Sequence, residues 1–190
     1  QNSVRANKAF LGYIAEFYEQ KGKVSTGYRI SRKEAFLETS NLSSAFQRMA
    51  QEPPSKQKNL DKIYELVVLN YTFLSSLASL STYIQQHNTT KASKTFSTSA
   101  QKITENLQLV LKCLKNQDAK ASYQIPEDGV MATEASEIWR QKYEQYSNTP
   151  DATKRDRQEA HLVTEQMQWL FSLSEKMLRV AGEGFGKFYT

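Results

Sequence analysis

Hydrophobic residues recur along this chain at steps of three and four, the period of an α-helix with one buried face. The pattern predicts helices over about 3–20, 28–51, 58–86, 91–116, 131–146 and 152–181. No stretch alternates apolar and polar residues with the period of two that a half-buried strand would show. We therefore predict an all-α fold for residues 1–190: one domain, an up-and-down antiparallel helical bundle of about six helices.

The most regular apolar line lies in the third predicted helix, and a similar line follows in the fourth. The line in the third helix alternates steps of three and four residues: Ile63, Leu66, Asn70, Phe73, Leu77, Leu80 and Ile84. Such a line is typical of a coiled-coil-like seam. Asn70 is its only polar member, which indicates a buried amide that fixes helix register; the alternative is a polar group that lines a small site. Because only a short link separates the third and fourth helices, we expect them to be antiparallel neighbours.

Residues 66–84 form a stretch of nineteen residues without a charge. Its length would suit a membrane-spanning helix, but it contains seven polar side chains: Asn70, Thr72, Ser75, Ser76, Ser79, Ser81 and Thr82. Burying so many polar groups in hydrocarbon is costly. The sequence therefore favours a central helix of a soluble bundle.

The overall charge is mildly basic, with 25 Lys and Arg against 20 Asp and Glu, for a net charge of +5. The excess is spread along the chain and could favour an anionic membrane surface. No basic block interleaves with aromatic residues in the manner of a nucleic-acid reader, so we expect no nucleic-acid partner. The chain shows no secretory signal and does not begin with Met, and we expect it to be part of a longer protein.

The residues that most often carry chemistry are few. Cys113 is the only cysteine and lies in a helical apolar pattern, which indicates a core or boundary position. His161 has Glu165 four residues later but no second histidine at ligand spacing, so it does not form a zinc motif. His87 lies in the link between two predicted helices and is interpreted as a helix-end residue.

Two further patterns are also interpreted structurally. The glycine-rich segment 182–186 follows a helix and does not join a strand to a helix, so we expect it to cap the last helix or to act as a linker. Glu134 and Glu137 share a helix face and are interpreted as a solvated surface. We therefore predict no catalytic residues, no metal site, no cofactor and no enzymatic activity.

One basic cluster opens the second predicted helix. Arg29, Arg32 and Lys33 lie within one and a half turns after Tyr28 and can share one surface. Positive charge at the start of a helix opposes the helix dipole, so the cluster contributes little to local stability. Two interpretations remain open: a charged helix start anchored by Tyr28, or a contact surface for phospholipid headgroups or an acidic partner.

The same region resembles a known family. The pattern Tyr28-Arg29-x-x-Arg32-Lys33-x-Ala35 is followed by Asn41-Leu42, Phe46-Gln47-Arg48-Met49 and Glu52-Pro53, then by Tyr64 and Val67-Val68-Leu69-Asn70. An upstream Asn-x-x-x-Leu-x-x-Ile element spans Asn7 to Ile14. These positions are similar to the soluble region of the FUSC (fusaric-acid-resistance-like), YccS-type family of bacterial inner-membrane proteins. The resemblance covers about residues 5–85.

The resemblance implies a transporter with two membrane-embedded blocks, each followed by a cytoplasmic helical region, that exports aromatic acids or similar small anions. This chain would be such a cytoplasmic region, on the cytoplasmic face of the inner membrane. It would pack against the protein's own transmembrane segments, join a homo-oligomer through the parent protein, and serve assembly or gating. The alternative is a free-standing helical adaptor or sensor bundle that binds a protein partner or a small ligand.

Overall fold

The computed structural model describes residues 1–20, 24–57, 59–86, 92, 94–115 and 154–185. These residues form five α-helices and a short 3-10 helix, and within those ranges there is no strand. The elements are α1 (Asn2–Gln20), α2 (Thr26–Ala50), η1 (Pro54–Lys56), α3 (Leu60–Gln86), α4 (Lys94–Lys115) and α6 (Lys154–Phe185). The all-α prediction is confirmed. The helix predicted over 131–146 lies outside the described residues, so the structure gives five helices rather than about six.

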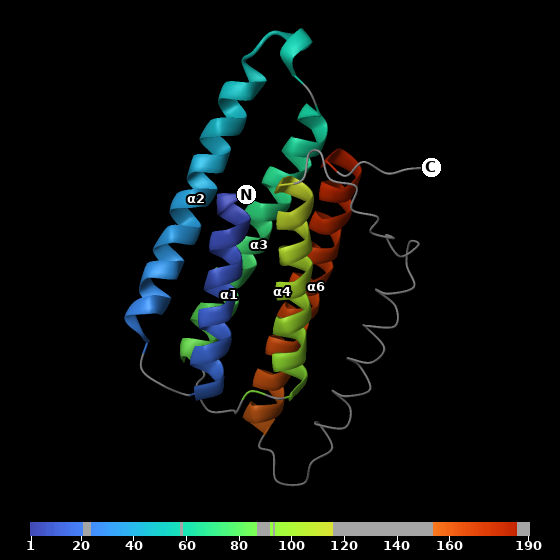
Figure 1. Ribbon diagram of the computed structural model, residues 1–190. Coiled ribbons are helices and arrows are strands. Elements are labelled where there is room, and N and C mark those ends of the chain that lie inside the picture. Colours follow the sequence, from blue (N-terminus) through green and yellow to red (C-terminus); the bar gives the residue numbers. More distant parts are fainter. Residues whose placement is uncertain (21–23, 58, 87–91, 93, 116–153, 186–190) are drawn as a thin grey trace.

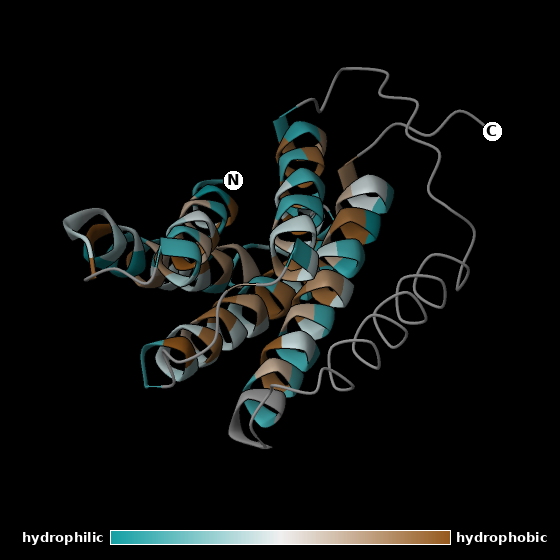
Figure 2. Ribbon diagram, turned by 90° about the horizontal axis from the view of Figure 1, so that it is seen from below, coloured by the Kyte–Doolittle hydropathy of each residue, from teal (hydrophilic) through white to brown (hydrophobic). Residues whose placement is uncertain are grey.

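Four of the helices, α1, α4, α6 and α3, form a ring, and α2 packs on the outside of the ring against α1 and α3 (Figures 1 and 2). Side-chain pairs show that α2 runs antiparallel to α3, since Thr39 pairs with Asn70 and Tyr28 pairs with Ser81. α3 and α6 are also antiparallel, since Ser76 pairs with Trp169 and Lys62 pairs with Glu183. Consecutive helices from α1 to α4 thus alternate in direction (Figure 1).

The prediction that the third and fourth helices are direct neighbours is wrong. α3 packs on α1, α2 and α6, whereas α4 packs on α1 and α6, so that α3 and α4 lie on opposite sides of the ring. α4 and α6 also run in the same direction, which departs from a simple antiparallel order (Figure 1). Both helices have a strong apolar seam, and each seam faces the shared core. A seam identifies the buried face of a helix but not the helix that covers it.

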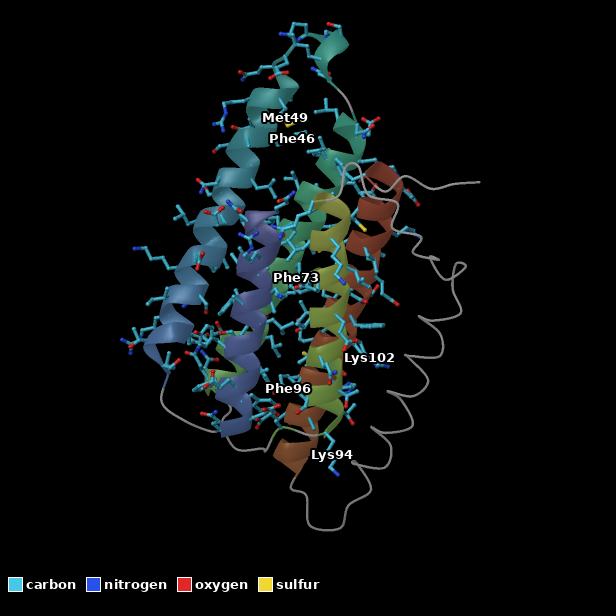
Figure 3. The ribbon with its side chains drawn as sticks, in the orientation of Figure 1. Phe46, Met49, Phe73, Lys94, Phe96 and Lys102 are labelled. Carbon is cyan, nitrogen blue, oxygen red and sulfur yellow. The ribbon has the colours of Figure 1, made fainter. Side chains whose placement is uncertain are left out.

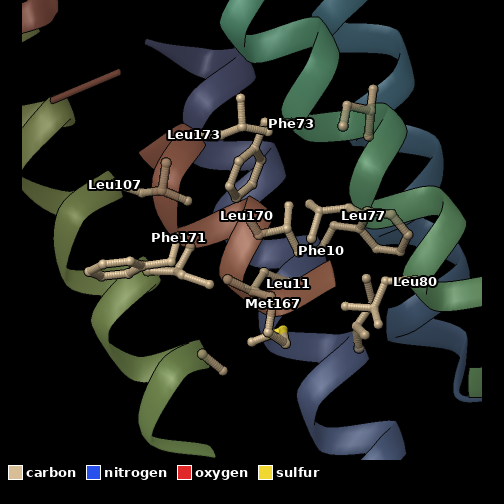
Figure 4. Close-up of a cluster of buried hydrophobic side chains, with 14 of the residues drawn as sticks. Phe10, Leu11, Phe73, Leu77, Leu80, Leu107, Met167, Leu170, Phe171 and Leu173 are labelled. Atoms are coloured by element: carbon tan, nitrogen blue, oxygen red, sulfur yellow. The ribbon is translucent and has the colours of Figure 1, made fainter. Parts of the chain in front are cut away.

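The core lies inside the ring and is built from the predicted seams (Figure 4). Phe73, Leu77, Leu80 and Ile84 of α3 are fully buried. On α4, Phe96, Ala100, Ile103, Leu107 and Val110 are also buried, and α1 and α6 contribute Phe10, Leu11, Ile14, Met167, Leu170 and Met177. Each large apolar side chain taken out of water in this way contributes about 1.5–3 kcal/mol. This filled interior is the main source of stability.

The hairpin of α2 and α3 projects beyond the start of α1. Ser3 of α1 pairs with Thr39, but α2 continues for eleven more residues to Ala50. Phe46 and Met49 lie between the projecting ends of α2 and α3 but are only half-buried (Figure 3). The ring of Phe46 packs 5.5 Å from that of Tyr64. The reason for the partial burial is that α1 does not extend far enough to cover this end.

The glycine-rich segment does not end the last helix as predicted. Gly182 and Gly184 are helical, and α6 continues to Phe185. The side-chain amide of Asn59 donates a 2.8 Å hydrogen bond to the backbone oxygen of Gly184. A Cβ atom added at Gly184 would lie 3.0 Å from Cβ of Lys62, so the glycine permits a close approach between the end of α6 and the start of α3.

Candidate contact surface

The first turn of α2 is fixed by Ser25 and Tyr28. The Ser25 hydroxyl accepts a 3.1 Å hydrogen bond from the backbone amide of Tyr28, which satisfies a donor that the helix start leaves free. The Tyr28 ring points inward and is buried, with its centroid 5.6 Å from Phe10 and 6.0 Å from Phe17. The predicted anchoring role of Tyr28 is confirmed.

The hydroxyl of Tyr28 is part of a hydrogen-bond network with α3. It pairs with the Ser81 hydroxyl and accepts a 2.5 Å hydrogen bond from the side-chain amide of Gln85. Burial raises the pKa of Tyr28 above its usual value, although Arg32 and the bond from Gln85 act in the opposite direction. The phenol therefore stays neutral at ordinary pH and functions as a structural tie between α2 and α3.

The basic residues of the same turn point the opposite way. Arg29, Arg32 and Lys33 are all exposed on the outward face of α2, so the structure brings the three predicted contact residues onto one surface. Within the described ranges, no ion pair joins any of them to a carboxylate. Of the two acidic residues nearby, Glu38 lies at the edge of α2 that faces α1, where it lines a hollow with Gln1 and Asn2, and Glu34 is exposed one turn before it. The three cations thus outnumber the one exposed carboxylate beside them. The outward face is therefore basic.

Three exposed apolar side chains share this face, and the sequence analysis did not identify them as part of it. Ile30, Phe36 and Leu37 are 58%, 46% and 53% exposed. The guanidinium carbon of Arg32 lies 5.9 Å from the centroid of the Phe36 ring, a cation–π distance. A usable signal was present: Ile30 and Leu37 are seven residues apart and off the buried line through Tyr28 and Ala35. We call Arg29, Ile30, Arg32, Lys33, Phe36 and Leu37 the α2 outer face.

Asn70 lies in a buried polar cluster with three other side chains. Its amide nitrogen donates to the Ser3 hydroxyl, and to that of Thr39 at 3.3 Å. Its side-chain oxygen accepts a 3.1 Å hydrogen bond from the amide of Asn7. Ser3 and Thr39 complete the cluster at 3.1 Å from each other, and all four residues are buried. The cluster ties α1, α2 and α3 at one level, as expected of a register-setting amide.

The residues considered for chemistry do not converge on one place. Cys113 is half-buried, and burial raises the pKa of its thiol. Exposed His161 lies 3.3 Å from Glu165, and across the described ranges no three His, Cys, Asp or Glu side chains form a group that could hold a metal ion. His87, Glu134 and Glu137 lie outside the described residues.

An open hollow lies between the first turn of α1 and the middle of α2. It is lined by Gln1, Asn2, Ser3, Glu38, Asn41 and Leu42. Glu38 is the only acidic residue among these lining residues. The hollow offers a shallow polar recess rather than an enclosed ligand site.

α3 has the length and apolar composition of a helix that could cross a membrane, and no other helix in the described part of the chain has both. Its inner face nevertheless packs in the bundle core and carries the polar cluster at Asn70. These contacts are those of a bundle helix, as the seven polar side chains of residues 66–84 predicted.

Comparison with known proteins gives one relative. The chain is 29% identical over 86 residues to the inner membrane protein YccS of Escherichia coli (strain K12). It is similar to an inner-membrane protein. The match covers 45% of this chain and 12% of the relative, so the chain spans only a small part of the relative's length. No family model and no solved structure matches the chain. The similarity supports a relationship to YccS-like membrane proteins, in line with the family resemblance.

Proposed function

We propose that this chain is a non-catalytic helical domain on the cytoplasmic face of a bacterial inner-membrane transporter of the FUSC, YccS-like type. The domain serves assembly or gating of the membrane part, whose cargo would be aromatic acids or similar small anions. The similarity to an inner-membrane protein supports the link to a membrane. The transported substrate and the gating role come from the family resemblance alone.

The observation that carries the proposal is the composition of the α2 outer face. Three cations lie on it without carboxylate partners in the described part of the chain, beside three apolar side chains that the fold leaves in water. Because these side chains are exposed, neither the three cations nor the three apolar residues add much to the free energy of unfolding. A surface that combines Lys and Arg with Phe, Leu and Ile suits the boundary between anionic headgroups and acyl chains. We therefore assign this face to the anionic surface of the inner membrane.

The expected binding strength agrees with a domain that is tethered rather than free. Each Lys or Arg near an anionic membrane contributes about 1 kcal/mol, so three give about 3 kcal/mol. Together with some burial of apolar side chains, this gives a free domain a weak and reversible attachment, which can be measured at low salt and high lipid concentration. Attachment to neighbouring transmembrane segments would raise the effective concentration enough to make the contact persistent.

The absence of a catalytic role is also part of the proposal. The bundle interior is filled by apolar side chains, and Glu159 is the only carboxylate buried within the described residues. The buried polar cluster around Asn70 consists of amides and hydroxyls. Such groups stabilise a defined packing of helices but supply no titratable pair for acid–base chemistry. A domain of this kind acts through its surfaces.

Flotation of the 190-residue chain with lipid vesicles tests the membrane contact. We expect it to bind vesicles that contain phosphatidylglycerol and not vesicles of phosphatidylcholine alone, with binding that falls as salt rises. The variant R29E/R32E/K33E should lose this binding. The matched control K102E/K112E/K115E changes three exposed lysines of α4 by the same charge and should retain most of it.

Two results would contradict the proposal. Equal loss of binding in both triple variants would mean that net charge acts without a specific surface. Absence of vesicle binding, together with recovery of the native full-length protein in the soluble fraction of its cells, would favour the free-standing adaptor or sensor. In that case the hollow beside Glu38 would be the first place to examine for a ligand.

A further inference from the structure

The outward face of α3 lacks charge over most of its length. A single line of side chains at steps of three and four points away from the core and is exposed: Tyr64, Val68, Tyr71, Ser75, Ser79 and Thr82. At 1.5 Å per residue this line is about 27 Å long. Tyr64, Val68 and Tyr71 are 56%, 45% and 64% exposed. We call these six residues the α3 stripe; Figure 2 shows that α3 is largely hydrophobic between its ends and that its outer side faces away from the ring.

Trp169 of α6 borders the α3 stripe. Its indole nitrogen donates a 3.1 Å hydrogen bond to the hydroxyl of Ser76, which holds the ring beside α3. The ring is still 45% exposed, and the Lys176 ammonium lies 5.8 Å from its centroid. The bond satisfies the polar end of the indole while the apolar ring remains available to a partner. The fold therefore holds an aromatic side chain rigidly at the rim of an uncharged surface.

We propose that the α3 stripe, with Trp169 at its rim, is the face through which two copies of this chain associate. Charge decides the occupant. The chain carries a net charge of +5, so two copies repel each other weakly overall, and an uncharged face is where they can meet without bringing like charges together. The stripe has no charge to oppose itself or to attract an acidic or basic partner. The centre of a protein interface is typically depleted of charge and enriched in Tyr and Trp, as this surface is.

Symmetry fixes how the two copies meet. Two identical chains most often associate about a two-fold axis, which brings the same patch of both copies together. An axis perpendicular to α3 at the middle of the stripe would pair the two α3 helices in antiparallel fashion. Tyr71 and Ser75 lie nearest that midpoint, and Tyr64 of one copy would face the region of Thr82 of the other.

The size of the stripe sets the expected strength. Stable complexes usually bury about 800 Å² on each partner, and one helix face with a single tryptophan supplies less. We therefore expect an association in the micromolar range or weaker for the free chain. The association deepens the assembly role proposed above and rests on it, because copies held in one membrane protein would meet at a much higher effective concentration.

Sedimentation velocity over a range of concentrations of the 190-residue chain tests the proposal. We expect a reversible monomer–dimer equilibrium. The variant V68E/Y71E would place four carboxylates in the contact and should weaken association on the order of 100-fold. The control T98E/Q101E adds the same charge on exposed positions of α4 and should associate like the parent chain. Circular dichroism should show equal helix content in all three proteins.

A crosslinking arm locates the symmetry axis. In a Cys113→Ser background, S75C should form a disulfide-linked dimer on oxidation, because two Cβ atoms near the axis can approach to about 3.8 Å. S44C, at an exposed serine of α2, should remain monomeric. A chain that stays monomeric at every concentration, or a dimer that V68E/Y71E does not weaken, would overturn the proposal.

The proposals for the α2 outer face and for the α3 stripe can be tested independently. R29E/R32E/K33E should lose vesicle binding and keep self-association, whereas V68E/Y71E should show the reverse. If V68E/Y71E instead lost vesicle binding and the parent chain did not dimerise, the α3 stripe would be a lipid contact and the proposal of a second copy would be wrong.

Discussion

The side-chain oxygen of Asn70 on α3 accepts a 3.1 Å hydrogen bond from the amide of Asn7 on α1, and neither residue is accessible to solvent. This pair lies at the centre of the polar cluster with Ser3 and Thr39. One oxygen of the cluster, Oδ1 of Asn7, has no partner in the described part of the chain. The hydrogen-bonding capacity of the cluster is therefore already incompletely used, and removal of another member should be costly.

Substitution of Asn70 by Ala should lower the free energy of unfolding by about 2–4 kcal/mol, since the amide of Asn7 and the hydroxyls of Ser3 and Thr39 each lose one hydrogen-bond partner in a buried place. Urea unfolding followed by circular dichroism measures this loss. Asn41→Ala is the matched control, because Asn41 is exposed on α2, and it should change stability by less than about 0.5 kcal/mol. Equal effects of the two substitutions would show that the cluster is not a stabilising tie.

Substitution of Tyr28 by Phe should destabilise the chain by about 1–2 kcal/mol at neutral pH, because the Ser81 hydroxyl and the Gln85 amide lose a buried partner. The ring contacts with Phe10 and Phe17 remain. Tyr64→Phe removes an exposed hydroxyl and should have little effect. Thermal unfolding of the two variants side by side provides the comparison.

Tyr28 should also make stability depend on alkaline pH. Its pKa is raised in the folded chain, so the unfolded chain loses the phenolic proton first, near the ordinary tyrosine pKa of 10.0. The folded state then binds more protons than the unfolded state, and the free energy of unfolding falls as pH rises from there to the folded pKa. This contribution is fully present below pH 10 and should be absent from the Tyr28→Phe variant. Urea midpoints of both proteins at pH 8 and pH 11 test the difference.

Substitution of Glu175 on α6 should stabilise the chain at neutral pH, whereas substitution of Asn70 or Tyr28 should destabilise it. Burial raises the pKa of its carboxyl above the ordinary glutamate value of 4.5, so the ionised form disfavours folding and the free energy of unfolding falls as pH rises above that value. Glu175→Gln should therefore raise the unfolding midpoint at pH 7 by a small amount and have no such effect below pH 4. The exposed control Glu34→Gln should not produce a pH-dependent gain.

Cys113 should react slowly with alkylating reagents. Its thiol is half-buried on α4, and burial raises its pKa, so the reactive thiolate is scarcer at neutral pH than in a free cysteine. Iodoacetamide at pH 7.5 should modify the folded chain several-fold more slowly than it modifies the chain in urea. Equal rates in the two conditions would mean that the thiol is open to solvent.

The sequence predicted the helices well because their signals are local. The seam positions from Phe73 to Ile84 are buried as expected, and Pro53 lies just after the end of α2. The end of α6 was misplaced because Gly182 is usually a breaker, yet here the close approach of Lys62 and the bond from Asn59 keep the helix intact to Phe185. Tertiary contacts decided that boundary, and they are not visible in a local pattern.

The surfaces were harder to predict than the core. Arg29, Arg32 and Lys33 stand together in the sequence, so their common face could be inferred from spacing. Ile30 and Leu37 were missed although their spacing places them off the line through Tyr28 and Ala35, because a hydrophobic residue is expected to be buried until its neighbours are known. The α3 stripe was missed for a related reason: residues 66–84 were predicted to form a central helix of the bundle, whereas one side of α3 is exposed.

The unequal lengths of α1 and α2 have a consequence for motion. Beyond Leu42, the last turns of α2 pack on α3, no third helix covers them in the described part of the chain, and the ring of Phe46 packs 5.5 Å from that of Tyr64. Few apolar contacts protect these backbone amides, so they should open at a lower energetic cost than the amides of the ring. The ring of four helices is therefore more rigid than the last turns of α2. Under a pulling force these turns would detach from α3, starting at Ala50, before the ring unfolds.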